Sequence, residues 1–126
     1  MTSPSMHIGE VAERTSLSLR TLRHYDEIGL VVPSGRTEGG FRLYAEEDVA
    51  QLMLVRRMKP LGYSLDEMRT VLAAFGELGR DPASAEHLAT IRAIREAAED
   101  RRRKLVEQVA MAEEFLDQLA ALEVRR

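Results

Sequence analysis

A short helix is predicted between Ser18, which can cap its N-terminus, and Gly29, which can end it. Side chains suited to hydrogen bonding lie on one side of this helix. At about 100° per residue, Leu19, Leu22 and Asp26 fall together, and the two leucines are expected to face inward. The opposite side carries Arg20, Thr21, His24 and Tyr25. Arginine can donate paired hydrogen bonds to guanine or phosphate, and threonine can contact a thymine methyl group. This face is therefore suited to a DNA groove.

Other roles stay open for some of these residues. Arg23 lies between the two faces, so we expect it either to pair with Asp26 or Glu27 or to contact a phosphate. For the residues of the groove-facing side, the alternative is a helix face that is merely solvated.

A second basic group follows the helix. Arg36 and Arg42 flank the pair Gly39–Gly40, which permits the positive φ angles of a β-hairpin turn. Both arginines could reach phosphates, as the wing beside a groove-binding helix does, and a solvated pair of turn arginines is the alternative. Phe41 and Tyr44 are expected to pack the hairpin against the helices.

Tyr63 precedes a capped helix, where its hydroxyl could bind a phosphate while its ring packs; packing alone is equally open. The predicted DNA-binding set therefore comprises Arg20, Thr21, Arg23, His24, Tyr25, Arg36, Arg42 and Tyr63.

The elements that position these residues are mainly helical. Residues 1–6 look like a frayed lead-in, and Ile8–Thr15 has the apolar spacing of a short helix. Two short helices joined by a tight turn form a helix-turn-helix unit, and the hairpin makes it winged. A third helix is expected over residues 46–58, and a fourth opens at the Ser64–Glu67 capping box and closes at Gly76. The buried stripe of the fourth helix is expected to contain Leu65, Met68, Val71, Leu72 and Phe75.

Asp81-Pro82 opens the last predicted helix, and no glycine or proline follows Pro82 up to about Leu122. It would have roughly 40 residues and a length of about 60 Å. An apolar stripe with steps of three and four, broken around residues 100–104, is typical of a coiled-coil seam. The seam comprises Ile91, Ile94, Ala98, Leu105, Val109, Ala112, Leu116 and Leu119. Such a helix is not stable alone in water, so we expect it to pair with a second copy in a homodimer.

The charge distribution is uneven. The formal net charge is −3, yet residues 14–44 contain five arginines and three acids, whereas residues 63–126 contain ten basic and thirteen acidic residues. Because solvent ions screen the distant acids, a local basic region can still meet a phosphate backbone.

The composition also excludes several kinds of site. The absence of cysteine excludes disulfides and thiolate metal sites. His7, His24 and His87 lack metal-ligand spacing, so we expect neither a metal nor a cofactor. No catalytic base stands beside a nucleophile, and no apolar run or signal peptide indicates a membrane, so we expect a cytoplasmic protein that is not an enzyme.

Residues 8 to about 75 resemble the DNA-binding domain of the MerR-type (mercury-resistance regulator) family. The matching features are Ile8-Gly9-Glu10, Thr21-Leu22-Arg23, Tyr25, Gly29-Leu30, Pro33, Arg36, Gly40, Arg42-Leu43-Tyr44 and Leu61-Gly62-Tyr63-Ser64-Leu65. The long helix is similar to the one through which such regulators dimerise as an antiparallel coiled coil. The resemblance implies a winged helix-turn-helix DNA-binding domain over residues 1–76 and a linker with a dimerisation helix over residues 77–126.

Family members bind as dimers to a pseudo-palindrome in an overlong promoter spacer and distort it for RNA polymerase. The resemblance therefore implies three partners: double-stranded promoter DNA, a second copy and RNA polymerase. It also implies that Arg20 and Thr21 read the groove, while the remaining arginines and tyrosines of the set clamp phosphates. The alternative is an architectural, excisionase-like DNA-bending protein that never contacts polymerase. A coiled-coil adaptor without DNA binding is disfavoured, because both arginine-bearing elements are intact.

The sequence departs from the family pattern at several positions. His24 stands where a tyrosine is frequent, Phe41 where a wing tyrosine is usual and Ala45 where a capping serine is common. The loss of the cap should cost the third helix about 1 kcal/mol. The cysteines of metal- and redox-sensing members and the large C-terminal drug-binding domain of others are expected to be absent, so the effector is unknown.

Overall fold

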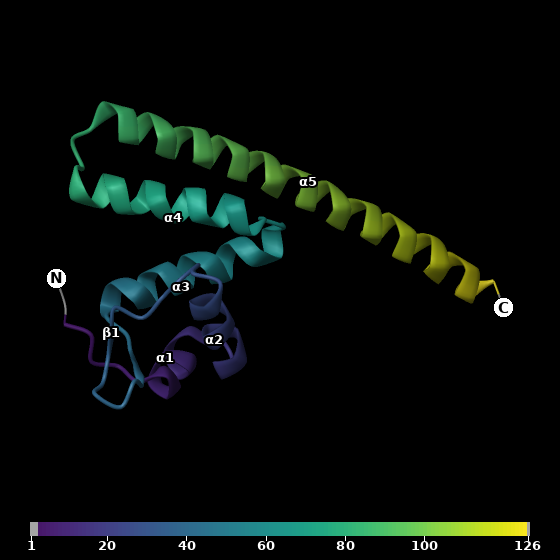
Figure 1. The fold of residues 1–126 in the computed structure, drawn as a ribbon. Coiled ribbons are helices and arrows are strands. Elements are labelled where there is room, and N and C mark those ends of the chain that lie inside the picture. The colour runs from purple at the N-terminus through teal and green to yellow at the C-terminus, as the bar shows by residue number, and fades with distance from the viewer. Residues whose placement is uncertain (1–2, 126) are drawn as a thin grey trace. The chain divides into compact units, whose positions relative to one another are not determined.

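The computed structural model describes residues 3–125, and these are mainly helical, as predicted. The chain divides into two compact units, Met1–Gly76 and Glu77–Arg126, and the division falls within one helix. The elements in chain order (Figure 1) are α1 (Ile8–Thr15), α2 (Leu19–Glu27), β1 (Gly35–Arg36), β2 (Arg42–Leu43), α3 (Glu46–Met58), a 3-10 turn (Lys59–Leu61), α4 (Leu65–Arg80) and α5 (Ala85–Val124). The predicted winged helix-turn-helix followed by a long helix is confirmed.

Short polar side chains form the turn between α1 and α2. The buried Thr15 hydroxyl donates to the Val11 carbonyl at 2.8 Å and accepts from the Leu17 amide at 3.3 Å. Ser16 then takes a left-handed conformation with φ 59°. Ser18 accepts a hydrogen bond from the Thr21 amide at 3.0 Å, which confirms it as the cap of α2. The turn thereby fixes where α2 begins.

The C-terminal end of α2 closes as predicted at Gly29, whose φ is 71°. The Gly29 amide donates to the Asp26 carbonyl at 3.0 Å, and the Leu30 amide donates to the Tyr25 carbonyl at 2.9 Å. These two bonds satisfy carbonyls that the helix leaves without an intrahelical donor.

The core of the first unit is built around α3. Its buried residues Val49, Leu52, Val55 and Met58 recur at helical spacing. They share the core with Val11, Leu22, Tyr25, Val31 and Tyr44. The helix-turn-helix unit and the hairpin are therefore held to one apolar centre.

The hairpin is short and turns where predicted. Gly35 pairs with Leu43 and Arg36 pairs with Arg42 in the antiparallel register. Of the two tip glycines only Gly40 has a positive φ, 83°.

The two hairpin aromatics differ from each other. Tyr44 is fully buried, as predicted, and no described residue hydrogen-bonds its hydroxyl. The expectation that Phe41 packs against the helices is wrong, because Phe41 is 70% exposed. Its ring lies beside Gly39 instead, where an added Cβ would come within 3.3 Å of it.

The predicted frayed lead-in is wrong for residues 5 and 6. Met6 is buried and forms a β-bridge with Tyr44, whose amide donates to the Met6 carbonyl at 2.8 Å. The free edge of β2 offers backbone groups that the preceding segment can pair with. Residues 1 and 2 lie outside the described residues.

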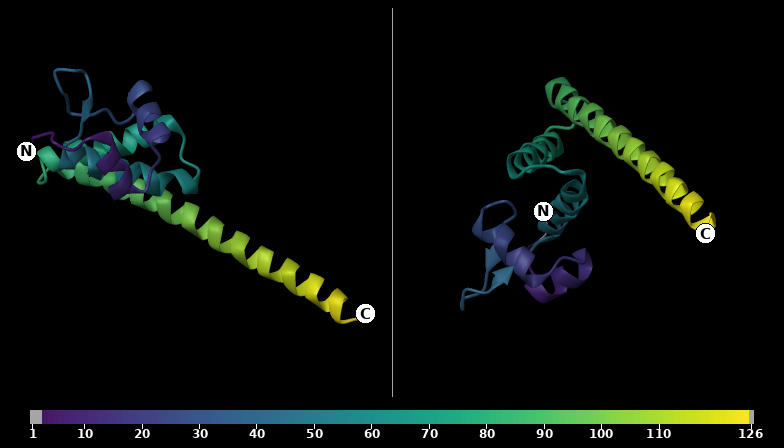
Figure 2. Two further views of the ribbon diagram at one scale, coloured as in Figure 1. Left: turned by 90° about the horizontal axis from the view of Figure 1, so that it is seen from below. Right: turned by 90° about the vertical axis from the view of Figure 1, so that its right-hand side faces the viewer.

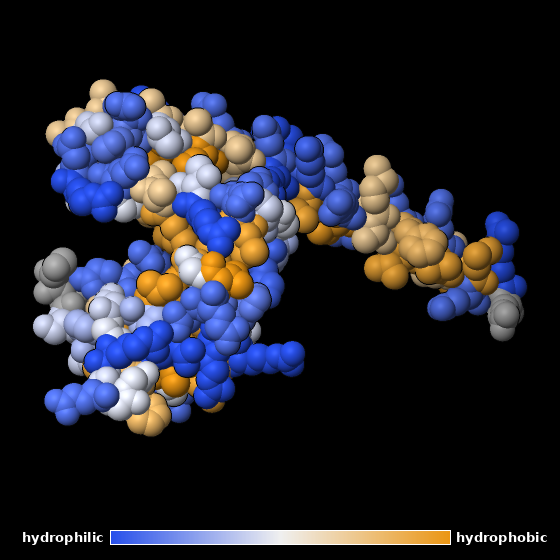
Figure 3. All heavy atoms as spheres, in the orientation of Figure 1, coloured by the Kyte–Doolittle hydropathy of each residue, from blue (hydrophilic) through white to orange (hydrophobic). Residues whose placement is uncertain are grey.

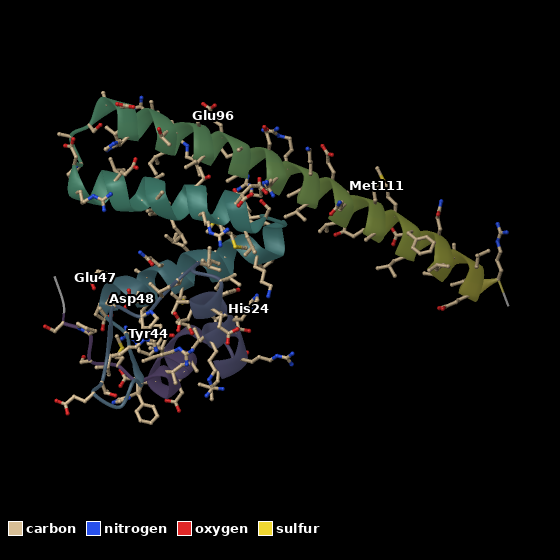
Figure 4. The ribbon with its side chains drawn as sticks, viewed as in Figure 1. His24, Tyr44, Glu47, Asp48, Glu96 and Met111 are labelled. Carbon is tan, nitrogen blue, oxygen red and sulfur yellow. The ribbon has the colours of Figure 1, made fainter. Side chains whose placement is uncertain are left out.

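The first turn of α3 is acidic, and one of its carboxylates, that of Asp48, also fixes the backbone before the helix. Asp48 is buried and accepts hydrogen bonds from the Ala45 amide at 2.8 Å, from the Ser34 amide at 3.0 Å and from the Ser34 hydroxyl at 2.7 Å. Ala45 has no side-chain acceptor, so only this half of a capping box is present. Asp48 and Tyr44 both lie in the first unit (Figure 4).

The predicted limits of the last two helices need correction. α4 runs through Gly76 to Arg80, because a glycine inside a helix lowers its stability without ending it. Ser64 and Glu67 form the predicted capping box, with bonds of 3.1 and 2.9 Å. The buried residues of α4 are Met68, Val71 and Ala74, whereas Leu65 and Phe75 are exposed.

The last helix, α5, begins at Ala85 and not at Pro82. Ser84 is its cap and accepts from the His87 amide at 3.2 Å, and Asp81–Ala83 lie in the turn before it. Figure 2 shows α5 as one uninterrupted helix.

An ion-pair cluster, the Asp26 clamp, joins the hairpin to α2. The Oδ2 atom of Asp26 accepts from Arg42 Nε at 2.7 Å and from Arg36 Nη2 at 2.9 Å. Burial alone would raise the pKa of Asp26, but the hydrogen bonds from Arg42 and Arg36 outweigh it and hold this pKa below the ordinary value. The hairpin is thus attached to α2 through one carboxylate that stays ionised at neutral pH.

The stabilisation by the clamp is expected to disappear only in acid. An aspartate of the unfolded chain has a pKa of about 3.9. Because the pKa of Asp26 is lower in the folded chain, the ion pairs contribute fully above that value and are lost as the pH falls through the folded pKa. The free energy of unfolding of Asp26→Asn should lie below that of the wild type by an amount that is constant from about pH 7 to pH 5 and shrinks below about pH 4. Denaturant titrations followed by circular dichroism measure this difference; one that already shrinks above pH 5 would contradict the clamp.

Candidate nucleic-acid interface

The outer face of α2 borders a hollow of about 530 Å³ on the surface of the first unit. Its lining combines hydrogen-bonding and cationic side chains: Arg20, Thr21, His24, Tyr25, Glu27 and Lys59. The four residues predicted to share one side of α2 therefore do lie together. Arg20 and His24 are exposed, and His24 is labelled in Figure 4.

Tyr25 differs from the other three. Its side chain is only 5% exposed, and burial raises the pKa of its hydroxyl. Leu22 and Tyr25 face the core together, because residues three apart lie on the same side of a helix. Leu19, which was expected to face inward, is 40% exposed. The inward face of α2 is thus rotated from the predicted one toward Tyr25, which reaches the hollow from the core.

Lys59 lines the hollow but was not among the residues predicted from the sequence. It follows α3 at the start of the 3-10 turn, more than thirty positions after α2, and the tertiary fold brings it beside Arg20 and His24. Its signal in the sequence is a lone lysine before Pro60 in a chain that otherwise uses arginine almost throughout. With Arg20, it gives the hollow two permanent positive charges against the single carboxylate of Glu27.

The predicted ion pair of Arg23 with Asp26 or Glu27 is not found in the part of the chain that the structure describes, whereas its predicted phosphate contact stays a prediction. Asp26 is engaged by Arg36 and Arg42, and none of the described residues forms an ion pair with the exposed Arg23. Its guanidinium is therefore presented to solvent beside the hollow-lining face. Tyr63 is half-buried, and its predicted phosphate contact stays a prediction.

The two hairpin arginines use different donors in the clamp. Arg36 directs Nη2 to Asp26 and Nη1 to the Gly40 carbonyl, the latter at 3.4 Å. Arg42 directs only Nε to Asp26, and no described residue accepts from its two terminal amino groups. Arg36 thus fastens the hairpin tip, whereas Arg42 keeps the fork that can hold a phosphate with two hydrogen bonds.

The predicted dimer seam divides into two parts. Ile91, Ile94 and Ala98 are half-buried within the chain, whereas the five seam residues from Leu105 onward are exposed. Further large apolar side chains outside the predicted seam are also exposed: Val106, Met111, Phe115, Leu122 and Val124. Figure 3 shows this apolar surface along the C-terminal half of α5.

Among residues 3–125 the structure shows neither a metal site nor a membrane-spanning helix. No group of three or more histidine and carboxylate side chains there could hold a metal ion. No described helix is long and apolar enough to cross a membrane.

Two known protein families together match nearly the whole chain. The family described as "MerR HTH family regulatory protein" matches residues 6–74, and that described as "MerR, DNA binding" matches residues 49–122. The HTH-type transcriptional regulator HmrR of Rhizobium leguminosarum bv. viciae is 39% identical over 103 residues, which cover 77% of this chain and 79% of that protein. The regulator CueR of Vibrio cholerae is 37% identical over 79 residues, 63% of this chain and 57% of its own length. The chain thus spans little more than half of CueR.

Solved structures agree with these matches. HiNmlR, a MerR family regulator lacking the sensor domain and bound to promoter DNA, is 28% identical with a TM-score of 0.59, covering 94% of this chain and 85% of that one. A MerR family regulator from Listeria monocytogenes is 30% identical with a TM-score of 0.62, covering 91% and 80%. The chain belongs to the MerR family of helix-turn-helix regulatory proteins.

Proposed function

We propose that this protein is a sequence-specific DNA-binding regulator of transcription that acts as a homodimer on promoter DNA. The observation that carries the proposal is the outer face of α2, where Arg20, Thr21 and His24 lie together with Lys59 around one hollow. The likeness to HiNmlR, solved on promoter DNA, supports it. As a DNA-binding protein it would act in the cytoplasm, where a bacterial chromosome lies.

The groove-facing part of the interface is α2. Arg20 and Thr21 stand in its first turn, so their side chains can approach base edges when the N-terminal end of the helix enters a major groove. His24 follows one turn later on the same face. Arg23 and Lys59 flank this face with positive charge, which suits contacts to the phosphates beside the groove.

The hairpin supplies a phosphate contact at a defined position. Because Asp26 holds Arg42 through Nε, the terminal amino groups of Arg42 keep a fixed direction relative to α2. Arg36 fixes the hairpin and is a positioning residue in this proposal. These contacts are local, so the formal net charge of −3 does not oppose them at physiological ionic strength.

The second copy would bind through the exposed apolar side of α5. A helix of 40 residues with so many large apolar side chains in solvent requires a partner. Pairing with an identical helix places two DNA-binding heads at opposite ends of a closed, symmetric assembly. Two heads related by a two-fold axis match a pseudo-palindromic operator.

The regulatory step follows from the distances that such an assembly fixes. Two heads held at a set spacing can bind both half-sites only if the DNA between them bends or untwists, at a cost of about 1–6 kcal/mol. By its family resemblance, the protein would use this distortion to realign promoter elements for RNA polymerase. No observation on this chain favours the architectural alternative.

Selection of an operator tests the proposal directly. Wild-type protein should enrich an inverted repeat from a random-sequence duplex library and should alter transcription in vitro from a promoter carrying it. Arg20→Ala should weaken binding to the selected duplex by about 1–3 kcal/mol and relax selectivity at one base pair. Arg95→Ala on α5 removes the same charge and should bind like wild type. Enrichment of no sequence would contradict the proposal.

The salt dependence of binding separates the two hairpin arginines. Arg42→Ala should reduce the slope of log Kd against log salt by about one, because one phosphate contact is lost. Arg36→Ala should lower affinity while the slope stays near that of wild type. Fluorescence anisotropy with the selected duplex at several salt concentrations measures both. A reduced slope for Arg36→Ala alone would reverse the assignment.

Two matched substitutions test the dimer. Ala112 belongs to the predicted seam, and Ala110, also exposed, lies about 200° away around the helix. Ala112→Glu places a charge in the predicted seam and should be a monomer of about the chain mass of 14.2 kDa. Ala110→Glu places the same charge outside the seam and should remain a dimer of twice that mass. Size-exclusion chromatography with light scattering at micromolar concentration distinguishes the two masses. A monomeric wild type, or equal behaviour of the two variants, would contradict the seam.

A further inference from the structure

A hydrogen bond joins the C-terminal end of α2 to α4 across 41 positions of sequence. Nη2 of Arg69 donates to the carbonyl oxygen of Ile28 at 2.8 Å. The other terminal nitrogen of Arg69 lies 3.5 Å from Asp66 Oδ1, one turn back along α4. The guanidinium of Arg69 therefore lies between Asp66 on α4 and the C-terminal end of α2. α2 is the helix that carries most of the hollow-lining residues.

The acceptor is one of the carbonyls that a helix end leaves unsatisfied. Gly29 and Leu30 satisfy the carbonyls of Asp26 and Tyr25, and Arg69 satisfies that of Ile28. The end of a helix also carries partial negative charge, so a guanidinium placed there is attracted twice, as a donor and as a cation. This bond fastens the end of α2 opposite to its groove-entering N-terminus.

We infer that Arg69 is a positioning residue through which α4 sets the orientation of α2 on DNA. α2 is held by its core residues, by the Asp26 clamp on its flank and by Arg69 at its end. Arg69 lies on α4, and α4 continues past the division between the two units as far as Arg80. A rotation of α4 is therefore passed to α2 through Arg69 and changes the angle at which Arg20 and Thr21 enter the groove. The inference rests on the proposed function.

The test measures the shape of bound DNA as well as its affinity. The probe is the duplex that wild-type protein selects from a random library, labelled with a fluorophore at each end. In Arg69→Ala the affinity should fall about 2- to 30-fold with an unchanged salt slope, and energy transfer at saturating protein should report a less bent duplex. Arg80→Ala removes the same charge from the same helix and should match wild type. If Arg69→Ala does not fold, Arg69→Gln replaces it.

Each outcome decides between the inference and its rivals. A salt slope reduced by about one would show that Arg69 contacts a phosphate and would overturn the positioning role. A lower melting temperature with wild-type affinity and bend would also overturn it, because the bond would then only stabilise the fold. If wild type binds without bending the duplex, the affinity and slope of Arg69→Ala decide. If wild type selects no duplex, the proposed function itself fails.

Discussion

The attachment of the hairpin to α2, and with it the direction of the hairpin arginines, depends on one carboxylate oxygen. Asp26 lies on α2 and is 11% exposed, and both arginines come from the strands of the hairpin. A buried charge of this kind is unfavourable unless it is paired, so removing either arginine leaves part of the desolvation penalty uncompensated. The same oxygen therefore fixes the direction of Arg42 and fastens the tip through Arg36, and Arg23 forms no ion pair with any described residue. An arginine-rich surface is thus ordered by a single acidic side chain.

Local signals predicted local structure correctly, and long-range contacts account for the differences. The Ser18 cap, the Gly29 stop and the Ser64–Glu67 capping box depend on residues within one turn of each other, so spacing alone identifies them. The clamp at Asp26 and the bonds between Asp48 and Ser34 depend on partners at least ten positions away, which no periodicity reports. A helical wheel gives relative angles but not the direction of the core, so Tyr25 was placed on the outer side and Leu19 on the inner one. Lys59 reaches the hollow for the same long-range reason.

The two units differ in how their stability arises. The first buries a continuous apolar core from four helices and a hairpin, whereas no residue of α5 is fully buried. Helix propensity alone does not hold 40 residues in water, and the apolar side chains of its C-terminal half would add little to a monomer. In the proposed homodimer, folding of the second unit would be linked to association, and its apparent stability should rise with protein concentration. Regulation by abundance would then follow from the surface through which we propose that two copies pair.

The bridge between Met6 and Tyr44 has a practical consequence. Three backbone hydrogen bonds join residues 5 and 6 to Tyr44. Pro4 lies so close to Gly35 that a Cβ added to Gly35 would come within 2.9 Å of the proline ring. Residues 4–6 thus lie against the hairpin, and an isolated β-bridge joins Met6 to Tyr44. Affinity tags joined at this end need a flexible spacer, and trimming the chain as far as Met6 would uncover a sheet edge and with it a site for self-association.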